Sequence, residues 1–254
     1  MKPTILITGA SSGFGLLIAN QLHKSGFNVI GTSRNPEKYA ATVPFKMIAL
    51  DLDSEQSITT FSERLLKETT QLDVLINNAG FYVSGIAEET PIELGRQQLE
   101  TNFWGTIKVT NAILPHFRKQ KSGKIITVSS IIGLVSFPNT AYYAASKHAL
   151  EGYFKSLRYE LNEFNIEVAM IEPAAFKTNV GQVSKPFRTR FGYHIVKVVD
   201  KRANRGEVTV AHIMIVKPNV SDAAQQEKAK ATIEDIYKKI QQGESFESLA
   251  QQFS

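Results

Sequence analysis

The sequence contains no cysteine and no long apolar run. The lack of cysteine excludes a disulfide framework, a cysteine-ligated metal site and a thiol nucleophile. No stretch approaches the about 18 consecutive apolar residues of a transmembrane helix, and the apolar run after Pro3 is too short for a secretory leader. His23, His116 and His148 have no metal-ligand spacing, so we expect no metal. These absences predict a cytoplasmic protein without a membrane partner.

The composition changes near position 184. The chain of 254 residues is 43% hydrophobic and 21% charged, which is typical of a globular protein. Residues 1–183 hold 17 Lys+Arg and 16 Asp+Glu, whereas residues 184–254 hold 12 and 8 and supply most of the net charge of +5. The charges of this second part alternate in sign along a predicted helix. This pattern favours a solvated helix face over a nucleic-acid patch, so we expect no nucleic-acid partner.

Short apolar runs alternate with longer amphipathic stretches in residues 1–183. The runs are continuously apolar, as in strands buried on both faces of a sheet. This order predicts βαβ units and an α/β fold, a doubly wound parallel sheet of the Rossmann-like kind, with a ligand crevice at the carboxyl ends of its strands. The predicted strands are Ile5–Ile7, Val29–Ile30, Met47–Leu50, Val74–Ile76, Ile125–Val128 and Val168–Ile171, and the predicted helices lie near 13–25, 54–70, 91–121 and 142–163.

Residues 184–254 predict a different, small α+β arrangement of a hairpin followed by helices. Phe191–Val199 and Glu207–Val216 have the character of two strands joined by a turn. An amphipathic helix near 221–242 follows, Gly243 ends it, and a short helix spans 245–253. We therefore divide the chain into a domain of residues 1–183 and an incomplete segment of residues 184–254.

A glycine-rich loop joins the first predicted strand to the first predicted helix. Glycines at this point permit a tight turn, and the helix N-terminus offers N–H groups and partial positive charge to a pyrophosphate. The setting between strand and helix predicts a dinucleotide site. Its candidate ligands are Gly9, Ser11, Ser12, Gly13, Phe14 and Gly15.

The second strand leads into Ser33 and Arg34. Folds that bind NAD commonly carry an acidic residue at this point, which binds the ribose hydroxyls. A hydroxyl and a guanidinium instead suit a 2′-phosphate, so NADPH is favoured over NADH as the cofactor. The alternative interpretation is a solvated surface arginine.

Tyr143 and Lys147 stand at positions i and i+4 of a predicted helix, on one face. An ammonium group beside a phenol stabilises the phenolate and makes the tyrosine a more effective acid and base. Ser130 follows the strand Ile125–Val128, and we expect its hydroxyl to orient a substrate carbonyl. The alternative for the Tyr-Lys pair alone is a surface contact that arises by chance.

These motifs together resemble the short-chain dehydrogenase/reductase family. The matching segments are TGASSGFG (8–15), Asp51, NNAG (77–80), TNFWG with Asn102, Ser130, and Tyr143 with Lys147. The resemblance implies hydride transfer between a nicotinamide and a carbonyl or alcohol substrate. It also implies a homodimer formed through the helices near 91–121 and 142–163.

The resemblance assigns roles to individual residues. Tyr143 is the expected general acid and base, with Lys147, Ser130 and Asn102 as its catalytic partners, and Asn102 would hold a proton-relay water. Tyr143 and Lys147 are also expected to contact the cofactor. The other implied cofactor ligands are Asp51 and Leu52 near adenine, Asn78, Ala79 and Gly80 near the ribose, and Pro173 and Thr178 near the nicotinamide.

The chain departs from the family pattern after the sixth strand. Ala174 follows Pro173 where the family usually has glycine, and the substrate-covering segment and seventh strand are not recognisable. The substrate therefore cannot be read from the sequence.

Residues from about 184 to 254 resemble pieces of a parvulin-type peptidyl-prolyl isomerase, in permuted order and incomplete. The matching pieces are FRTRFGYHIVKVVDKR (187–202), VTVAHIMI (208–215) and GESFESLAQQFS (243–254). A hairpin centred on Ala203 predicts that His194 lies opposite His212. Three interpretations stay open: a structural histidine pair, a module that binds or isomerises proline peptides, and a chimeric chain that binds cofactor but has little activity.

Overall fold

The computed structural model describes residues 2–172, 182–183, 187–189, 192–201, 208–216 and 223–253. The chain divides into two compact units, Met1–Ile171 and Glu172–Ser254. Pro173, Ala174 and Thr178 lie outside the described residues.

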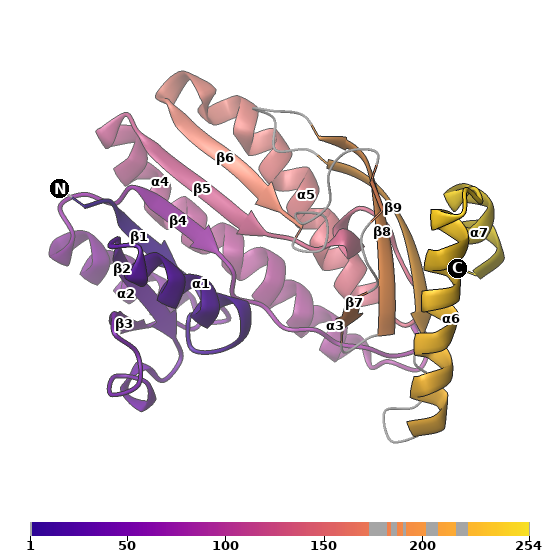
Figure 1. Ribbon diagram of the computed structural model, residues 1–254. Coiled ribbons are helices and arrows are strands. Elements are labelled where there is room, and N and C mark those ends of the chain that lie inside the picture. The colour runs from indigo at the N-terminus through magenta and orange to yellow at the C-terminus, as the bar shows by residue number, and fades with distance from the viewer. Residues whose placement is uncertain are drawn as a thin grey trace. The chain divides into compact units, whose positions relative to one another are not determined.

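The first unit contains a six-stranded parallel sheet in the order β3-β2-β1-β4-β5-β6 (Figure 1). The chain adds strands outward in one direction from β1 to β3 and in the other from β4 to β6. The order therefore reverses between β1 and β4, and the predicted doubly wound sheet is confirmed. The strands are β1 Thr4–Ile7, β2 Asn28–Ser33, β3 Lys46–Ala49, β4 Val74–Asn77, β5 Gly123–Val128 and β6 Ile166–Ile171.

Helices pack on both faces of this sheet because the strands carry apolar side chains on both faces. One buried cluster joins the strands to α2, α4 and α5, and a second joins them to α1. The helices are α1 Gly13–Lys24, α2 Glu55–Glu68, α3 Ile92–Leu99, α4 Thr106–Gln120 and α5 Ala141–Leu161. Short turns complete the unit: η1 Pro36–Lys38, η2 Glu100–Gly105, η3 Ile131–Gly133 and η4 Asn162–Phe164.

The predicted helix near 91–121 is interrupted. Between α3 and α4 the chain forms a π-helical turn, η2, over Glu100–Gly105. Such turns insert an extra residue into a helix and occur frequently at functional sites. This one carries Asn102, which is buried.

The second unit has a three-stranded antiparallel sheet in the order β7-β8-β9 and two helices. Its core contains Ile195 of β8 and Ile213 of β9 beside Ile233 and Ile236, so the apolar face of the long helix is core, as expected. Gly243, with φ of +99°, ends that helix as predicted. The elements are β7 Phe187–Thr189, β8 Gly192–Lys201, β9 Val208–Val216, α6 Ala223–Gln241 and α7 Phe246–Phe253.

The predicted pairing of His194 with His212 is wrong. His194 pairs with Met214, and His212 pairs with Val196, so the two histidines are offset by two positions. The two strands already pair three positions away from the predicted register at Lys201 and Val208. The irregularity between Val198 and Asp200 then shifts the register by one residue, which leaves an offset of two at the histidines.

Candidate active site

The glycine-rich loop has a backbone that only glycine accommodates without strain. Gly9 and Gly13 have φ values of +67° and +54°. A Cβ atom on Gly15 would overlap the carbonyl oxygen of Gly9 and the side-chain amide of Asn78. The loop is therefore tightly folded at the carboxyl end of β1, where the sequence predicts pyrophosphate binding.

The N-terminus of α1 is open to an anion. Ser12 is its N-cap residue and makes no side-chain capping hydrogen bond, and the first turn holds no acidic residue. Phe14 in that turn is exposed. Among the described residues no side chain caps the first N–H groups of α1, and the partial positive charge of the helix dipole lies behind them.

Asn78 fastens the glycine-rich loop to the neighbouring strand. Its side-chain amide donates hydrogen bonds to the carbonyl oxygens of Thr8 (2.9 Å) and Gly9 (3.2 Å). The backbone N–H groups of Asn78 and Ala79 both donate to Thr8 Oγ1, at 3.0 Å each. Asn78, which the sequence places near the ribose, therefore positions the loop. The reasoning from sequence missed Thr8, a hydroxyl residue at the strand end immediately before the first loop glycine.

The carboxyl end of β2 lies beside the same loop. Thr32 accepts hydrogen bonds from Ala10 N at its carbonyl oxygen (2.9 Å) and from Gly9 N at its hydroxyl (3.3 Å). Ser33 is buried, and its hydroxyl has no hydrogen-bond partner among the described residues. Arg34 is exposed. A buried, unpartnered hydroxyl next to an accessible guanidinium fits an added phosphate or hydroxyl of a ligand.

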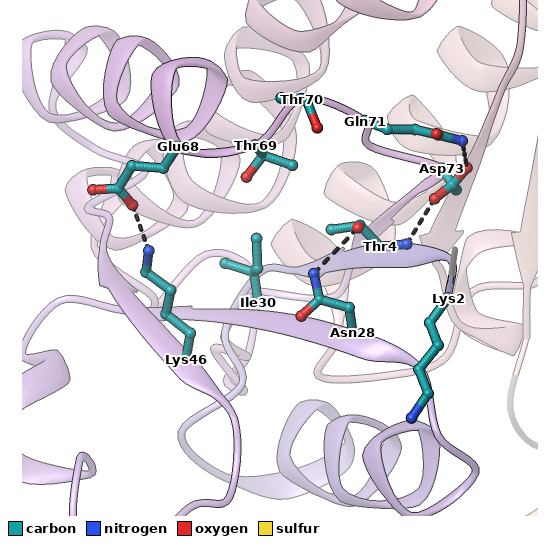
Figure 2. A pocket seen from close by; sticks show the side chains of 10 residues that line it. All are labelled: Lys2, Thr4, Asn28, Ile30, Lys46, Glu68, Thr69, Thr70, Gln71 and Asp73. Atoms are coloured by element: carbon teal, nitrogen blue, oxygen red, sulfur yellow. Dashed lines mark hydrogen bonds and ion pairs between the residues drawn. The ribbon is translucent and has the colours of Figure 1, made fainter.

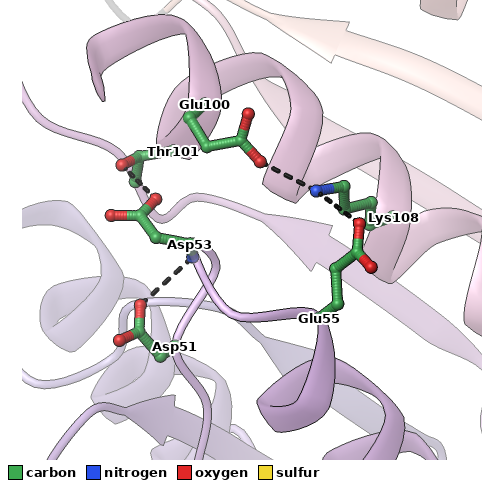
Figure 3. A network of polar contacts seen from close by, with 6 residues as sticks. All are labelled: Asp51, Asp53, Glu55, Glu100, Thr101 and Lys108. Carbon is green, nitrogen blue, oxygen red and sulfur yellow. Dashed lines mark hydrogen bonds and ion pairs between the residues drawn. The ribbon is translucent and has the colours of Figure 1, made fainter. Parts of the chain in front are cut away.

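The chain after β3 brings Asp51 and Leu52 to the same edge of the sheet. Leu50 N donates to the carbonyl oxygen of Ser33 at 2.9 Å, which joins the ends of β2 and β3. Asp51 Oδ1 accepts a hydrogen bond from the backbone N–H of Asp53 at 3.1 Å (Figure 3). Leu52 is buried beneath this turn.

Asn102 connects the end of β4 to α5. Its Oδ1 accepts from Phe81 N, and its Nδ2 donates to Phe81 O, both at 2.9 Å. Nδ2 also lies 3.2 Å from Ser146 Oγ, which in turn donates to the carbonyl oxygen of Tyr143 at 2.8 Å. A Cβ atom on Gly80 would lie 2.9 Å from Asn102 Oδ1, so glycine leaves the space that Asn102 occupies.

Lys147 is a buried ammonium at the centre of the predicted catalytic residues. Its Nζ donates to the carbonyl oxygen of Val128 at 2.8 Å and lies 5.7 Å from the centroid of the Tyr143 ring. Burial lowers the pKa of Lys147 from 10.5 to about 8, although attraction by the carboxylate of Glu151 acts in the opposite direction. Lys147 is therefore poised to change its charge close to physiological pH.

Tyr143 lies beside this lysine, and Ser130 follows two residues after Val128, whose carbonyl oxygen Lys147 binds. The Tyr143 ring meets the Tyr82 ring edge to face, with centroids 4.8 Å apart. Ser130 caps η3, where its Oγ accepts from Ile132 N at 3.2 Å. A Cβ atom on Gly133, which ends η3, would lie 3.2 Å from Lys147 Cβ, so this turn packs closely on α5. Ser146 and Glu151 were not predicted as site residues, because no motif marks them.

The predicted residues in the described part of the chain thus gather where β1 to β5 end. This is the edge at which ligands bind in open α/β sheets. A family model described as short chain dehydrogenase matches residues 3–188. The chain belongs to the short-chain dehydrogenase family.

Proteins of similar sequence and similar structure support the assignment of the chain to this family. The chain is 46% identical over 193 residues to the uncharacterized oxidoreductase YusZ of Bacillus subtilis, a match that covers 72% of this chain and 68% of YusZ. Its fold matches a short-chain dehydrogenase of Streptomyces avermitilis with a TM-score of 0.66 at 37% identity, over 70% and 68% of the two chains. The chain thus spans about two thirds of the length of these relatives.

Structures similar to this dehydrogenase hold either nicotinamide cofactor. ElxO with NADP bound has a TM-score of 0.64 at 31% identity, over 68% of this chain and 73% of that one. The NAD+-bound xylitol dehydrogenase has a TM-score of 0.64 at 26% identity, over 67% and 69%. The family fold therefore accepts both cofactors.

A second family model, the PPIC-type PPIase domain, matches residues 197–254. The resemblance to parvulin-type isomerases is therefore confirmed for this region. The dehydrogenase region is followed in this chain by a region of a different family.

A polar cavity of about 390 Å³ lies at the opposite edge of the dehydrogenase sheet (Figure 2). Thr4, Asn28 and Lys46, the first residues of β1 to β3, line it. Lys46 pairs with Glu68, and Asp73 accepts from Thr4 N at 2.6 Å. Since the predicted catalytic residues follow the carboxyl ends of the strands, this cavity is not the candidate active site.

Two absences hold for the described residues. No helix in the described part is both long and apolar enough to span a membrane. The described residues also contain no cluster of His, Asp or Glu side chains able to hold a metal ion.

Proposed function

We propose that this protein is an NADPH-dependent oxidoreductase that interconverts a carbonyl compound and the corresponding alcohol. The observation that carries the proposal is the buried Lys147 ammonium, 5.7 Å from the Tyr143 ring. Burying a charged lysine costs free energy. Here the ammonium lies over the Tyr143 ring, and among the described residues no carboxylate lies within hydrogen-bond distance of it. Such a pair suits proton transfer at a substrate oxygen.

The residues at the carboxyl edge of the sheet fit a dinucleotide. The uncapped start of α1 and the loop of Gly9 and Gly13 suit the pyrophosphate, and Asp51 suits the adenosine half. When bound, the cofactor would donate a hydride to the substrate carbon in reduction and accept one from it in oxidation.

Side chains of the protein then bind the substrate oxygen and transfer a proton to it. Ser130 donates a hydrogen bond that orients the carbonyl, and Tyr143 donates the proton that the oxygen gains on reduction. Lys147 stabilises the phenolate that Tyr143 leaves behind. Asn102 fixes the backbone of Phe81 and, through Ser146, the first turns of α5 that carry Tyr143.

Ser33 and Arg34 support a preference for NADPH. The buried hydroxyl of Ser33 lacks a partner among the described residues, and the guanidinium of Arg34 is accessible. Arg34→Ser should weaken NADPH binding by about 10- to 100-fold and leave NADH binding unchanged, because only NADPH carries the 2′-phosphate. Equal losses for both nucleotides would contradict this role.

The Tyr143→Phe variant tests the catalytic proposal. Phenylalanine keeps the ring contact with Tyr82 and removes the hydroxyl, so turnover of carbonyl substrates should fall at least about 1000-fold. The dissociation constant for NADPH should stay within about two-fold. Turnover close to that of the wild type would refute the assignment.

The match to the PPIC-type PPIase domain favours a second candidate function. The region of residues 197–254 would bind proline-containing peptides. The full chain is assayed for acceleration of proline isomerisation in a short peptide, and a His194→Ala/His212→Ala variant serves as the comparison. No acceleration and no peptide binding by the full chain would contradict this candidate.

A further inference from the structure

A polar network joins the chain after β3 to the π-helical turn η2 (Figure 3). Thr101 Oγ1 donates to Asp53 Oδ1 at 2.5 Å. Lys108 Nζ lies 2.8 Å from Glu100 Oε1 and 3.2 Å from Glu55 Oε1. The network therefore bridges the segment 51–55 to both η2 and α4, which are distant from it in the sequence.

Lys108 supplies the positive charge of this network. A hydrogen bond from Lys108 to Glu100 raises the pKa of Lys108, so the ammonium stays protonated over the physiological range. Asp53 Oδ1 and Thr101 form a charge-assisted hydrogen bond, which is stronger than one between neutral groups. The Asp53–Thr101 hydrogen bond and the Lys108–Glu55 ion pair hold the segment 51–55 to η2 and α4.

The backbone packing at the same place is close. A Cβ atom on Gly105, the last residue of η2, would lie 2.5 Å from the carbonyl oxygen of Leu52. The turn thus presses directly on the residue between Asp51 and Asp53. Side-chain hydrogen bonds and backbone contact independently fix the same two segments against each other.

The other side of η2 carries Asn102. That side chain is committed to Phe81 and Ser146, as described above. Thr101 and Asn102 are neighbours in the chain, so a single turn holds the segment 51–55 through one residue and the predicted catalytic residues through the next.

We propose that Asp53 and Thr101 are positioning residues for the adenine end of the cofactor. They fix Asp51 and Leu52 in place through η2, and so they determine cofactor affinity without touching the cofactor. This inference rests on the proposed function, since it requires that the segment 51–52 binds the adenine half.

Thr101→Val tests the proposal, because valine keeps the shape of threonine and removes its donor. The dissociation constants for NADPH and for 2′,5′-ADP, which carries only the adenine half, should both rise about 3- to 10-fold. Asp53→Ala should have the same effect, and the double variant should add little to either single change. Thr101→Ser keeps the hydroxyl and should bind like the wild type.

Thr42→Val is the matched control. Its hydroxyl donates to Tyr39 O at 3.0 Å on the surface and belongs to no predicted site. This variant loses a similar hydrogen bond and should bind both nucleotides with unchanged affinity.

For Thr101→Val, the KM for NADPH should rise while kcat stays within about two-fold, because the contacts of Asn102 are intact.

Unchanged affinity of Thr101→Val for 2′,5′-ADP would overturn the positioning role. So would a fall in kcat without any change in affinity. If the wild type binds no nicotinamide nucleotide, the proposed function fails and this inference fails with it. If the wild type binds the nucleotides and the Thr101→Val and Asp53→Ala variants bind them as tightly as the Thr42→Val control, the proposed function stands. In that case only this inference is overturned.

Discussion

Lys147 is the residue whose environment bears most directly on the proposed chemistry. Desolvation lowers its pKa to about 8, and Glu151, one helical turn further along α5, partly offsets the effect. Glu151 is itself buried, and its carboxylate oxygens have no hydrogen-bond partner among the described residues, although Lys155 Nζ lies 3.4 Å away. The charge of Lys147 therefore depends on a carboxylate that has few other partners.

The pKa of Lys147 predicts how carbonyl reduction depends on pH. Since the ammonium loses its proton as pH rises through about 8, reductase activity should fall over the same range. Glu151→Gln removes the attraction that raises this pKa, so the alkaline limb of the pH–rate profile should move lower by about half a pH unit or more.

Glu160→Gln is the control for this measurement. Glu160 lies on the same helix, is exposed and does not act on Lys147. Its pH–rate profile should match that of the wild type. A limb that stays in place in Glu151→Gln would show that Glu151 does not set the charge of Lys147.

Among the elements, the turn between β1 and α1 is the most restrictive. Gly15→Ala places a methyl group against the carbonyl of Gly9 and the amide of Asn78, so the loop must open. Nucleotide affinity should fall at least about 10-fold. Calorimetric titration with NADPH checks this.

Gly152→Ala supplies the comparison on another helix. A Cβ atom there meets nothing within 4 Å, and the residue lies inside α5. Its affinity should be unchanged, and its free energy of unfolding should rise by about 0.5–1 kcal/mol because alanine favours helix. Wild-type affinity in Gly15→Ala would contradict the close packing of the loop.

The sequence alone was enough to predict those strands and helices that follow simple hydrophobic patterns. All six strands of the first sheet were predicted, because continuous apolar runs such as Val74–Ile76 mark strands buried on both faces. The π-helical turn at Glu100–Gly105 was not predicted, since residue pattern does not reveal one additional residue in a helix. The three-residue strand β7 was missed because it is too short to show a period. The hairpin register was wrong because residue pattern alone does not fix which residues of two strands pair.

The residues that form the candidate site could be predicted from the sequence, but the hydrogen bonds between them could not. Strand order brings the residues after β1 to β5 together, so their grouping follows from topology. The hydrogen bonds of Asn78 to the loop and of Asn102 to Phe81 and Ser146 depend on side-chain packing across distant segments. Such contacts have no local pattern in the sequence.

For the whole molecule, we predict a homodimer through the helical segment α3–η2–α4 and α5. Both carry large exposed side chains, with Trp104 49% and Tyr159 76% exposed. The Trp104→Glu/Tyr159→Glu variant should sediment as a monomer where the wild type sediments as a dimer. A monomeric wild type would contradict this prediction.

Titration of the wild-type chain with NADPH and with NADH, followed by nucleotide fluorescence and by the melting temperature, tests the central claim most directly. The proposed function predicts saturable binding of both nucleotides, with NADPH at least about 10-fold tighter, and a rise in Tm on binding. Absence of binding by either nucleotide would contradict the account, because the glycine loop, Asn78 and Lys147 would then be assembled without the cofactor that they are proposed to serve.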